Sequence, residues 1–117
     1  MSLEQALAAA RAAGEKTLDE TVVLDVGEHL AITDYFVITS GRNDRQVRSI
    51  VDEIDRRLRM TGGGPPRQVE GLDAAEWVLV DYGDFVVHVF SPEARDLYAL
   101  ERLWADSTRI LSVGDLA

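Results

Sequence analysis

The sequence predicts a single α/β domain in which helices pack on a mixed five-stranded sheet. The chain has 117 residues, which is the length of one ordinary domain. Apolar residues make up 46% of it and charged residues 28%, which is typical of a globular protein and not of a disordered one. Short apolar runs alternate with segments of helical periodicity in the order α-β-β-α-β-β-β-α, a pattern that favours a layered α/β architecture.

The first third of the chain predicts a helix followed by two strands. Residues 3–16 are rich in alanine, and Gly14 is expected to end the helix that they form. The apolar face of this helix is thin, so we expect it at the periphery. Residues 21–26 and 35–39 are β-branched and aromatic runs, which predict strands. Because both runs are almost wholly apolar, the sheet is expected to be covered on both faces.

A second helix begins after Asn43, which is a suitable N-cap residue, with Gln46 placed to complete a capping box. Its apolar residues recur at helical spacing and form one stripe: Val47, Ile50, Val51, Ile54 and Leu58. The Gly-Pro segment at 62–66 ends this helix. It lacks the Lys-Ser/Thr ending of a phosphate-binding loop and does not lead into a helix, so we interpret it as a linker.

Three further strands are predicted at 67–70, 77–81 and 85–90. The last two are separated by Tyr82-Gly83-Asp84, and a Gly-Asp pair between apolar runs is a good signal for a hairpin.

Ser91, Pro92 and Glu93 predict a clean helix start, with an N-cap, a proline in the first turn and an acid near the positive helix end. We expect this last helix to run to about Asp106. The tail at 107–117 has no clear period and carries no prediction.

The last helix has a wider apolar arc than one sheet requires. With Leu97 at the centre, a rotation of about 100° per residue gives a core stripe made of Ala94, Leu97, Leu100 and Trp104. Tyr98 and Leu103 fall about 100° and 120° to either side, whereas a core stripe needs little more than about 100° in total. Either the N-terminal helix covers this excess, or a partner protein does.

The net charge is −9, and basic residues are absent from two long stretches, 17–41 and 68–94. The basic cluster that remains is interspersed with four acids: Arg42, Arg45, Arg48, Arg56, Arg57 and Arg59. Because nucleic-acid affinity depends largely on neutralised phosphates, we expect little or only secondary contact with RNA. An acidic surface suits a basic protein partner. The alternative is that the acidity only keeps the domain in solution.

Residues with catalytic chemistry are sparse. No Gly-x-Ser-x-Gly elbow is present, and the two histidines do not have the spacing of metal ligands. His88 lies in the middle of a predicted strand, where a hydrogen-bonded structural role or a contact with a partner is the better interpretation. The acidic pair Glu53 and Asp55 lies on a helix, about 200° apart, and so cannot share a Mg²⁺ ion as the carboxylates of a nucleotidyl transferase do. We expect no enzyme activity, no metal and no cofactor.

The location expected from the sequence is the cytoplasm. No run approaches the roughly eighteen apolar residues of a membrane span, so no membrane contact is expected. The N-terminus carries acids and lacks a long apolar core, so it does not look like a signal peptide. The absence of cysteine excludes disulfides.

Several separated motifs carry a family resemblance: residues 32–41, Gln46, 77–84, 87–90, Arg95, Tyr98, 100–101 and 103–104. In this order they resemble the ribosomal silencing factor family, also called Iojap-like proteins. The resemblance covers roughly residues 3 to 107. It implies a fold like that of the nucleotidyl transferases without their catalytic carboxylates, and a single ribosomal silencing factor domain over residues 1–117.

The resemblance also implies a function. Members of this family bind the large ribosomal subunit through ribosomal protein L-fourteen and block its association with the small subunit. Translation is thereby repressed when nutrients are scarce, by steric occlusion and without a cofactor. Some members form homodimers, so a homodimer is one state to test. The competing hypotheses are a nucleotide-binding or nucleotidyl transferase enzyme and a plain dimeric scaffold.

Carried over position by position, the resemblance assigns partner contacts to six residues: Trp77, Asp81, His88, Arg95, Tyr98 and Leu100. Tyr98 and Trp77 would be apolar anchors, and Asp81 with its acidic neighbours would meet basic side chains. Trp77 could equally belong to the core, and the helical periodicity favours the core for Leu100.

Overall fold

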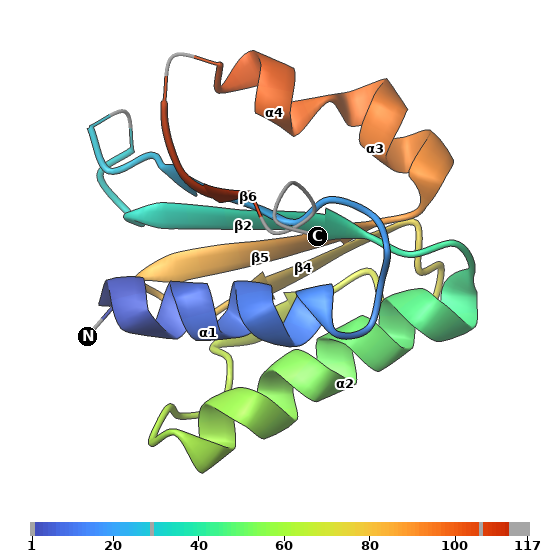
Figure 1. Cartoon of the computed structure of the whole chain (residues 1–117), viewed down its shortest axis with the longest axis horizontal. Coiled ribbons are helices and arrows are strands. Elements are labelled where there is room, and N and C mark those ends of the chain that lie inside the picture. Colours follow the sequence, from blue (N-terminus) through green and yellow to red (C-terminus); the bar gives the residue numbers. More distant parts are fainter. Residues whose placement is uncertain (1, 29, 106, 113–117) are drawn as a thin grey trace.

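Six strands form one mixed sheet with helices on both of its faces (Figure 1). The computed structural model describes residues 2–28, 30–105 and 107–112. The strands are β1 (Val22–Asp25), β2 (Tyr35–Ser40), β3 (Gln68–Glu70), β4 (Trp77–Asp81), β5 (Phe85–Phe90) and β6 (Thr108–Ser112). Their spatial order is β3-β4-β5-β2-β1-β6, in which β2 and β5 are parallel and all other neighbours are antiparallel. The predicted α/β class and mixed sheet are confirmed, with one more strand than expected.

One face of the sheet is covered by α1 (Ser2–Gly14) and α2 (Asp44–Met60), which lie side by side below the strands in Figure 1. The predicted stripe of α2 is buried as a whole against the valines of β2, β4 and β5. The expectation that α1 lies at the periphery was wrong, because five of its alanines are fully buried: Ala6, Ala9, Ala10, Ala12 and Ala13. Their small side chains let the helix backbone approach the sheet and α2 closely.

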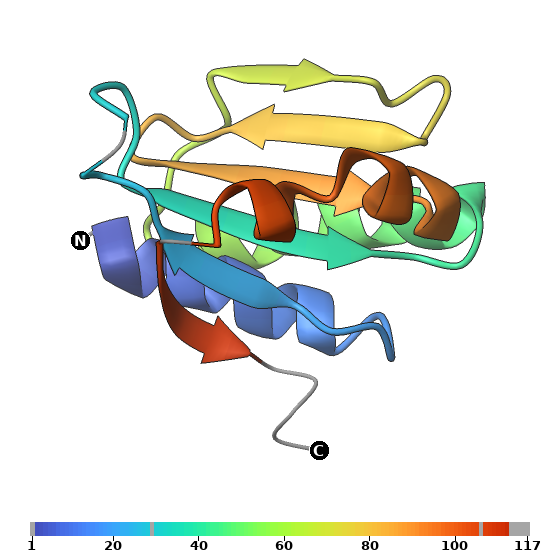
Figure 2. The same cartoon turned by 90° about the horizontal axis from the view of Figure 1, so that it is seen from above.

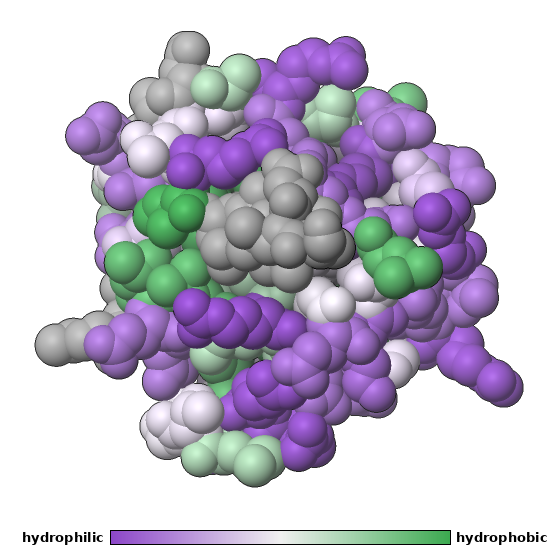
Figure 3. Space-filling view, in the orientation of Figure 1, coloured by the Kyte–Doolittle hydropathy of each residue, from purple (hydrophilic) through white to green (hydrophobic). Residues whose placement is uncertain are grey.

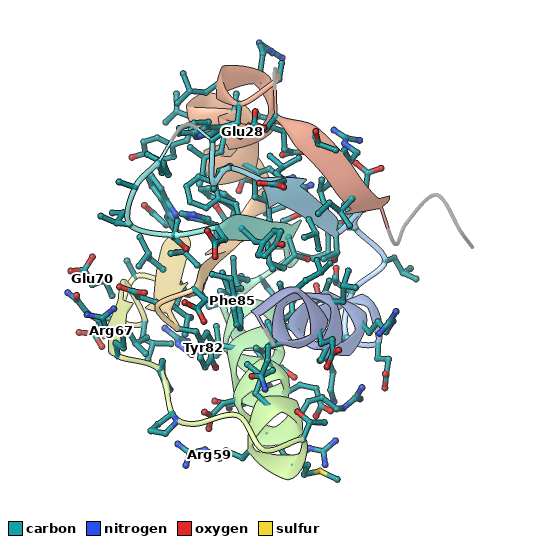
Figure 4. The ribbon with its side chains drawn as sticks, turned by 90° about the vertical axis from the view of Figure 1, so that its left-hand side faces the viewer. Glu28, Arg59, Arg67, Glu70, Tyr82 and Phe85 are labelled. Atoms are coloured by element: carbon teal, nitrogen blue, oxygen red, sulfur yellow. The ribbon has the colours of Figure 1, made fainter. Side chains whose placement is uncertain are left out.

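The hairpin between β4 and β5 closes one end of this face. Gly83 takes the positive φ of 92° that the predicted turn requires. Tyr82 and Phe85 stack with their ring centroids 5.0 Å apart. Figure 4 shows both rings beside α1 and α2, while Arg67 and Glu70 project from the β3 edge.

The other face carries α3 (Pro92–Tyr98) and α4 (Leu100–Leu103), which cross the middle of the sheet in Figure 2. A second core cluster lies beneath them: Val22, Leu24, Val26, Phe36, Ile38, Phe90, Ala94 and Leu100. No described helix covers β3 and β4 on this side (Figure 2). Both faces therefore carry a core, as the apolar strands predicted, but the second is less completely covered.

The last helix is broken, which contradicts the prediction of one continuous helix to Asp106. Ala99 adopts a left-handed conformation with φ 47° and ψ 48° between α3 and α4, and Asp106 itself lies outside the described residues. The break changes the helical phase, so that Leu100 is buried whereas Leu97 is 77% exposed. The prediction of Leu97 as the centre of a core stripe was therefore wrong.

The N-cap predictions for Asn43 and Ser91 are confirmed by side-chain hydrogen bonds. The predicted capping box is not formed, because Gln46 Oε1 accepts from the amide of Arg42 and not from that of Asn43. Asn43 Oδ1 accepts from the Gln46 amide at 2.9 Å, and Ser91 Oγ accepts from the Ala94 amide at 3.2 Å. The sixth strand was not predicted, because the short edge strand Thr108–Ser112 has no clear apolar alternation. It pairs with β1 across an irregular register between Val23 and Leu24.

Candidate partner-binding surface

Three of the predicted contact residues, Trp77, His88 and Tyr98, form one contiguous cluster. Trp77 opens β4 and is the cross-strand partner of Phe90, while His88 lies two residues earlier on β5. The indole Nε1 of Trp77 donates a hydrogen bond to His88 Nδ1 at 3.1 Å. Tyr98, the last residue of α3, places its ring centroid 4.5 Å from that of Trp77. The fold thus joins residues of two strands and a helix.

Exposure falls steadily through this cluster. Tyr98 is 49% exposed, Trp77 is half-buried, and His88 is only 4% exposed. His88 is therefore a hydrogen-bonded structural histidine, one of the two roles expected for it. Any effect of His88 on a partner would act through Trp77.

The burial of His88 controls its charge. Desolvation lowers the pKa of the imidazole to about 4, so the ring is neutral at physiological pH. Because Nδ1 accepts from Trp77, the proton of the neutral ring lies on Nε2, which is buried without a hydrogen-bond partner among the described residues. The ring instead meets Phe36 edge-on, with centroids 4.6 Å apart. A neutral imidazole thus orients the indole.

Arg95 is engaged inside the protein. Its guanidinium forms a bidentate pair with Glu101, with N–O distances of 2.9 and 3.0 Å. The remaining nitrogen donates to the Glu20 carbonyl at 2.7 Å and to Ser40 Oγ at 2.9 Å. Ser40 in turn donates to Asp19 at 2.8 Å. Arg95 therefore fastens α3 and α4 to the start of β1 and the end of β2, and four of its five N–H donors are engaged.

Asp81 and Leu100 lie apart from the exposed part of the cluster. Asp81 Oδ1 accepts from the Gly83 amide at 2.8 Å, which stabilises the β4–β5 turn. Leu100 is buried with the second core cluster, as its position in the predicted stripe suggested. The structure therefore brings together Trp77, His88 and Tyr98, and places the other three in supporting positions.

Sequence reasoning missed that Leu97 would be exposed beside Tyr98. Leu97 and Leu103 are 77% and 72% exposed, and α1, which was one candidate to cover them, lies on the opposite face of the sheet. The sequence gives no sign of the break at Ala99, because alanine favours a continuous helix and rarely adopts positive φ. The sequence predicted more apolar residues on this helix than the core needs, and the exposed ones include Leu97 and Tyr98 of α3.

The apolar side chains on the face seen in Figure 3 are scattered and do not form one cluster like that of Trp77 and Tyr98. Green patches on this face are separated by purple charged surface, and one of them lies over the loop that follows α1, where Leu18 is 99% exposed. A single exposed leucine of this kind is ordinary in soluble domains.

Three of the arginines of α2, Arg56, Arg57 and Arg59, pair with acids of the chain. Arg57 pairs with both Glu15 and Glu53, and Arg59 pairs with Asp55 at 2.9 Å. Arg56 also pairs with Glu53. Each of these pairs reduces the charge that the cluster presents to a polyanion.

The described residues offer no arrangement for metal chemistry. No group of three or more His, Cys, Asp or Glu side chains among them is placed to hold a metal ion. Glu53 and Asp55, the one acid-x-acid pair considered, contact different arginines.

A family model described as ribosomal silencing factor during starvation matches residues 1–117. The chain belongs to the ribosomal silencing factor family. A Bacillus subtilis protein named ribosomal silencing factor RsfS is 41% identical over 99 residues, which cover 85% of this chain and 83% of that protein. A Mus musculus protein named mitochondrial assembly of ribosomal large subunit protein 1 is 37% identical over 84 residues, covering 70% of this chain and 37% of its own length.

A solved structure shares the fold. The crystal structure of a Chromobacterium violaceum protein aligns with a TM-score of 0.83 at 30% identity and covers 90% of this chain and 87% of its own. Membership of the ribosomal silencing factor family supports a ribosome-associated silencing role, which is a regulatory role. None of the helices in the described part of the chain is long and apolar enough to cross a membrane.

Proposed function

We propose that this protein binds the large ribosomal subunit through ribosomal protein L-fourteen and sterically blocks association with the small subunit. Translation would be repressed in this way under nutrient limitation, in the cytoplasm and without a cofactor. Family membership supports the silencing role, and the name of the mouse relative refers to the large subunit.

The observation that carries the proposal is the uncovered apolar surface of α3. Leu97 and Tyr98 are exposed next to one another, and Tyr98 rests on the half-buried ring of Trp77. Tyrosine and tryptophan are enriched among residues that dominate binding energy, because they bury a large area at small entropic cost. We name Leu97, Tyr98 and the exposed part of Trp77 the α3 surface.

Rigidity favours this surface as a docking site. The hydrogen bond that Trp77 donates to His88 fixes the indole, and the pair of Arg95 with Glu101 fastens the helix that carries Tyr98. A preorganised surface loses less conformational entropy on binding than a mobile one. His88, Arg95 and Leu100 are accordingly proposed as residues that position the contact, with Trp77 and Tyr98 touching the partner.

The charge of the chain favours a basic protein over RNA. The net charge is −9, and three arginines of α2, Arg56, Arg57 and Arg59, are paired with acids. Acidic surfaces accelerate association with basic partners and repel polyanions. Asp81 and its neighbours Glu76 and Asp84 are proposed to contribute to this field, and contact with ribosomal RNA is proposed to be secondary.

The proposal is tested by co-sedimentation with purified large subunits, followed by addition of small subunits. We expect the protein to migrate with large subunits and the yield of whole ribosomes to fall as its concentration rises. A calorimetric titration with isolated ribosomal protein L-fourteen identifies the direct partner. Protein that stays at the top of the gradient, or whole ribosomes formed at unchanged yield, would contradict the function.

We also propose that the free protein can form a homodimer, and its oligomeric state can be measured. Sedimentation velocity of the free protein over a range of concentrations gives its oligomeric state. If a dimer forms through the α3 surface, excess large subunits should dissociate it. A dimer that binds subunits without dissociating must use another surface.

A further inference from the structure

A groove of about 490 Å³ lies beside the α3 surface, between α3, the loop before β4 and the first turn of α2. Its apolar lining is formed by Ala94, Leu97 and Tyr98 of α3. Three carboxylates also line it: Glu93 of α3, Asp44 at the start of α2 and Glu76 in the loop before β4. None of the residues that line the groove is a lysine or an arginine. The groove therefore combines apolar side chains with three carboxylates and has no basic residue in its lining.

The three carboxylates are free to bind an external cation. All three side chains are exposed, and none has a hydrogen-bond or ion-pair partner among the described residues. Asp44 and Glu93 lie in the first turns of α2 and α3, where an acid also interacts favourably with the helix dipole. Glu76 lies in no helix and receives no such benefit. Its carboxylate has no role in stabilising a helix end.

The loop that carries Glu76 is held in place by hydrogen bonds. Arg48 of α2 donates to the carbonyls of Leu72 and Asp73 at 3.1 and 2.8 Å. The amide of Ser91 donates to the Glu76 carbonyl at 2.8 Å, which ties the loop to the start of α3. Between them, Ala75 is fully buried with a positive φ of 54°. The position of Glu76 beside α3 is thus fixed before any partner arrives.

We propose that this groove receives an arginine or lysine side chain of the protein partner that docks on the α3 surface. This inference rests on the proposed function, since it names the chemistry of that partner. The aliphatic stem of such a side chain would lie along Leu97 and Tyr98, and its charged end would meet the carboxylates. An RNA phosphate is excluded from the groove, because three negative charges repel it.

The decisive variant replaces two of the three groove acids with neutral isosteres, Glu76→Gln and Glu93→Gln. We expect the affinity for purified large subunits to fall about ten-fold and to depend less steeply on salt concentration. The matched control is Asp52→Asn with Asp96→Asn, which changes the net charge equally at exposed positions outside the groove. The control should bind as the wild type does. Thermal unfolding of each variant verifies that the fold is retained.

Equal losses in the groove variant and the control would overturn the inference, because net charge alone would then explain the effect. Wild-type affinity in the groove variant would also overturn it, while leaving the proposed function intact. A change in the sedimentation coefficient of the free protein, caused only by the groove variant, would assign the groove to a second copy of the chain and would overturn it as well.

A peptide titration without ribosomes tests the groove independently of the proposed ribosome binding. We titrate the labelled protein with the peptide amide acetyl-Gly-Arg-Gly and follow backbone amide resonances by NMR. Saturable shifts at Glu76, Leu97 and Tyr98, absent with acetyl-Gly-Gly-Gly and absent in the groove variant, are expected. If the wild type fails to sediment with subunits, the proposed function fails, and this titration still decides whether the groove binds a cationic side chain. Absence of saturable shifts would overturn the inference.

Discussion

The two faces of the sheet differ in how completely their helices cover them. On one face, α2 is a single helix of 17 residues that buries five apolar side chains, with the alanines of α1 filling the space beside it. On the other face, the break at Ala99 leaves two short helices that bury Ala94 and Leu100 and expose Leu97, Tyr98 and Leu103. This difference indicates that the first face mainly stabilises the fold and that the second also provides a surface for binding.

Truncation in the first face should have the largest effect on stability. Ile50 is fully buried between α2 and the sheet, so Ile50→Ala should lower the free energy of unfolding by about 4 kcal/mol through lost burial and a cavity. Urea denaturation measures the change. Met60→Ala, at an exposed position of the same helix, should alter it by less than about 0.5 kcal/mol. Similar values for the two variants would show that the α2 face is not the stabilising one.

Lowering the pH should reduce the free energy of unfolding through protonation of His88, which lies on the second face. Its pKa is about 4 in the folded protein and about 6.5 when exposed, so the unfolded state takes up the proton first. The stabilisation that the neutral ring gives to the folded state is fully present above pH 6.5. It declines as the pH falls to about 4, and below that pH it changes no further. Compared with His88→Gln, the wild type should lose about 3 kcal/mol of unfolding free energy across that interval. Parallel pH profiles for the two proteins would contradict this.

Arg95 should stabilise the second face from within. Arg95→Met removes the pair with Glu101 and leaves that partly buried carboxylate unpaired, which should cost about 2 kcal/mol of unfolding free energy. Adding Glu101→Leu should recover part of this loss. Arg102→Met, an exposed control on α4, should have almost no effect. A stable Arg95→Met variant that fails only in binding would make Arg95 a direct contact instead.

The smallest stability effect is expected at the exposed leucine of α3. Leu97→Ser should change the free energy of unfolding by less than about 0.5 kcal/mol, because the side chain is 77% exposed. The affinity for large subunits should nevertheless fall several-fold. Leu18→Ser, in the loop after α1, is a matched control that should change neither quantity. Equal binding by both variants would remove Leu97 from the α3 surface.

Much of the fold could be predicted because local patterns agree with the tertiary structure. The stripe of α2 has a regular helical period, and the caps at Asn43 and Ser91 are residues that accept hydrogen bonds from helix amides. The hairpin at Gly83 needs a positive φ that glycine adopts readily.

What could not be predicted depends on contacts between distant residues. Ala99 adopts a left-handed conformation although alanine favours a helix. We infer that the bond network of Arg95 with Glu20 and Ser40 stabilises the break, and nothing in the local sequence marks it. The strand β6 is similarly defined by its pairing with β1.

The resemblance assigned six contact residues, and the structure brings three of them together: Trp77, His88 and Tyr98. The sequence motif alone did not tell which of the six are buried. His88 lies inside because β5 is a central strand with a core on both of its faces, and Leu100 lies inside because the first residue of α4 faces the second core cluster. The acidic groove joins α2, a loop and α3, and only the folded chain brings these segments together.

The role of the second face is tested most directly by the affinity of Tyr98→Ala for purified large subunits. The side chain is half exposed and rests on Trp77, so its loss should weaken binding by about 2 kcal/mol, roughly thirty-fold. The thermal unfolding midpoint, measured on the same sample, should stay close to that of the wild type. Unchanged affinity with an intact fold would contradict the account and would show that the subunit docks elsewhere.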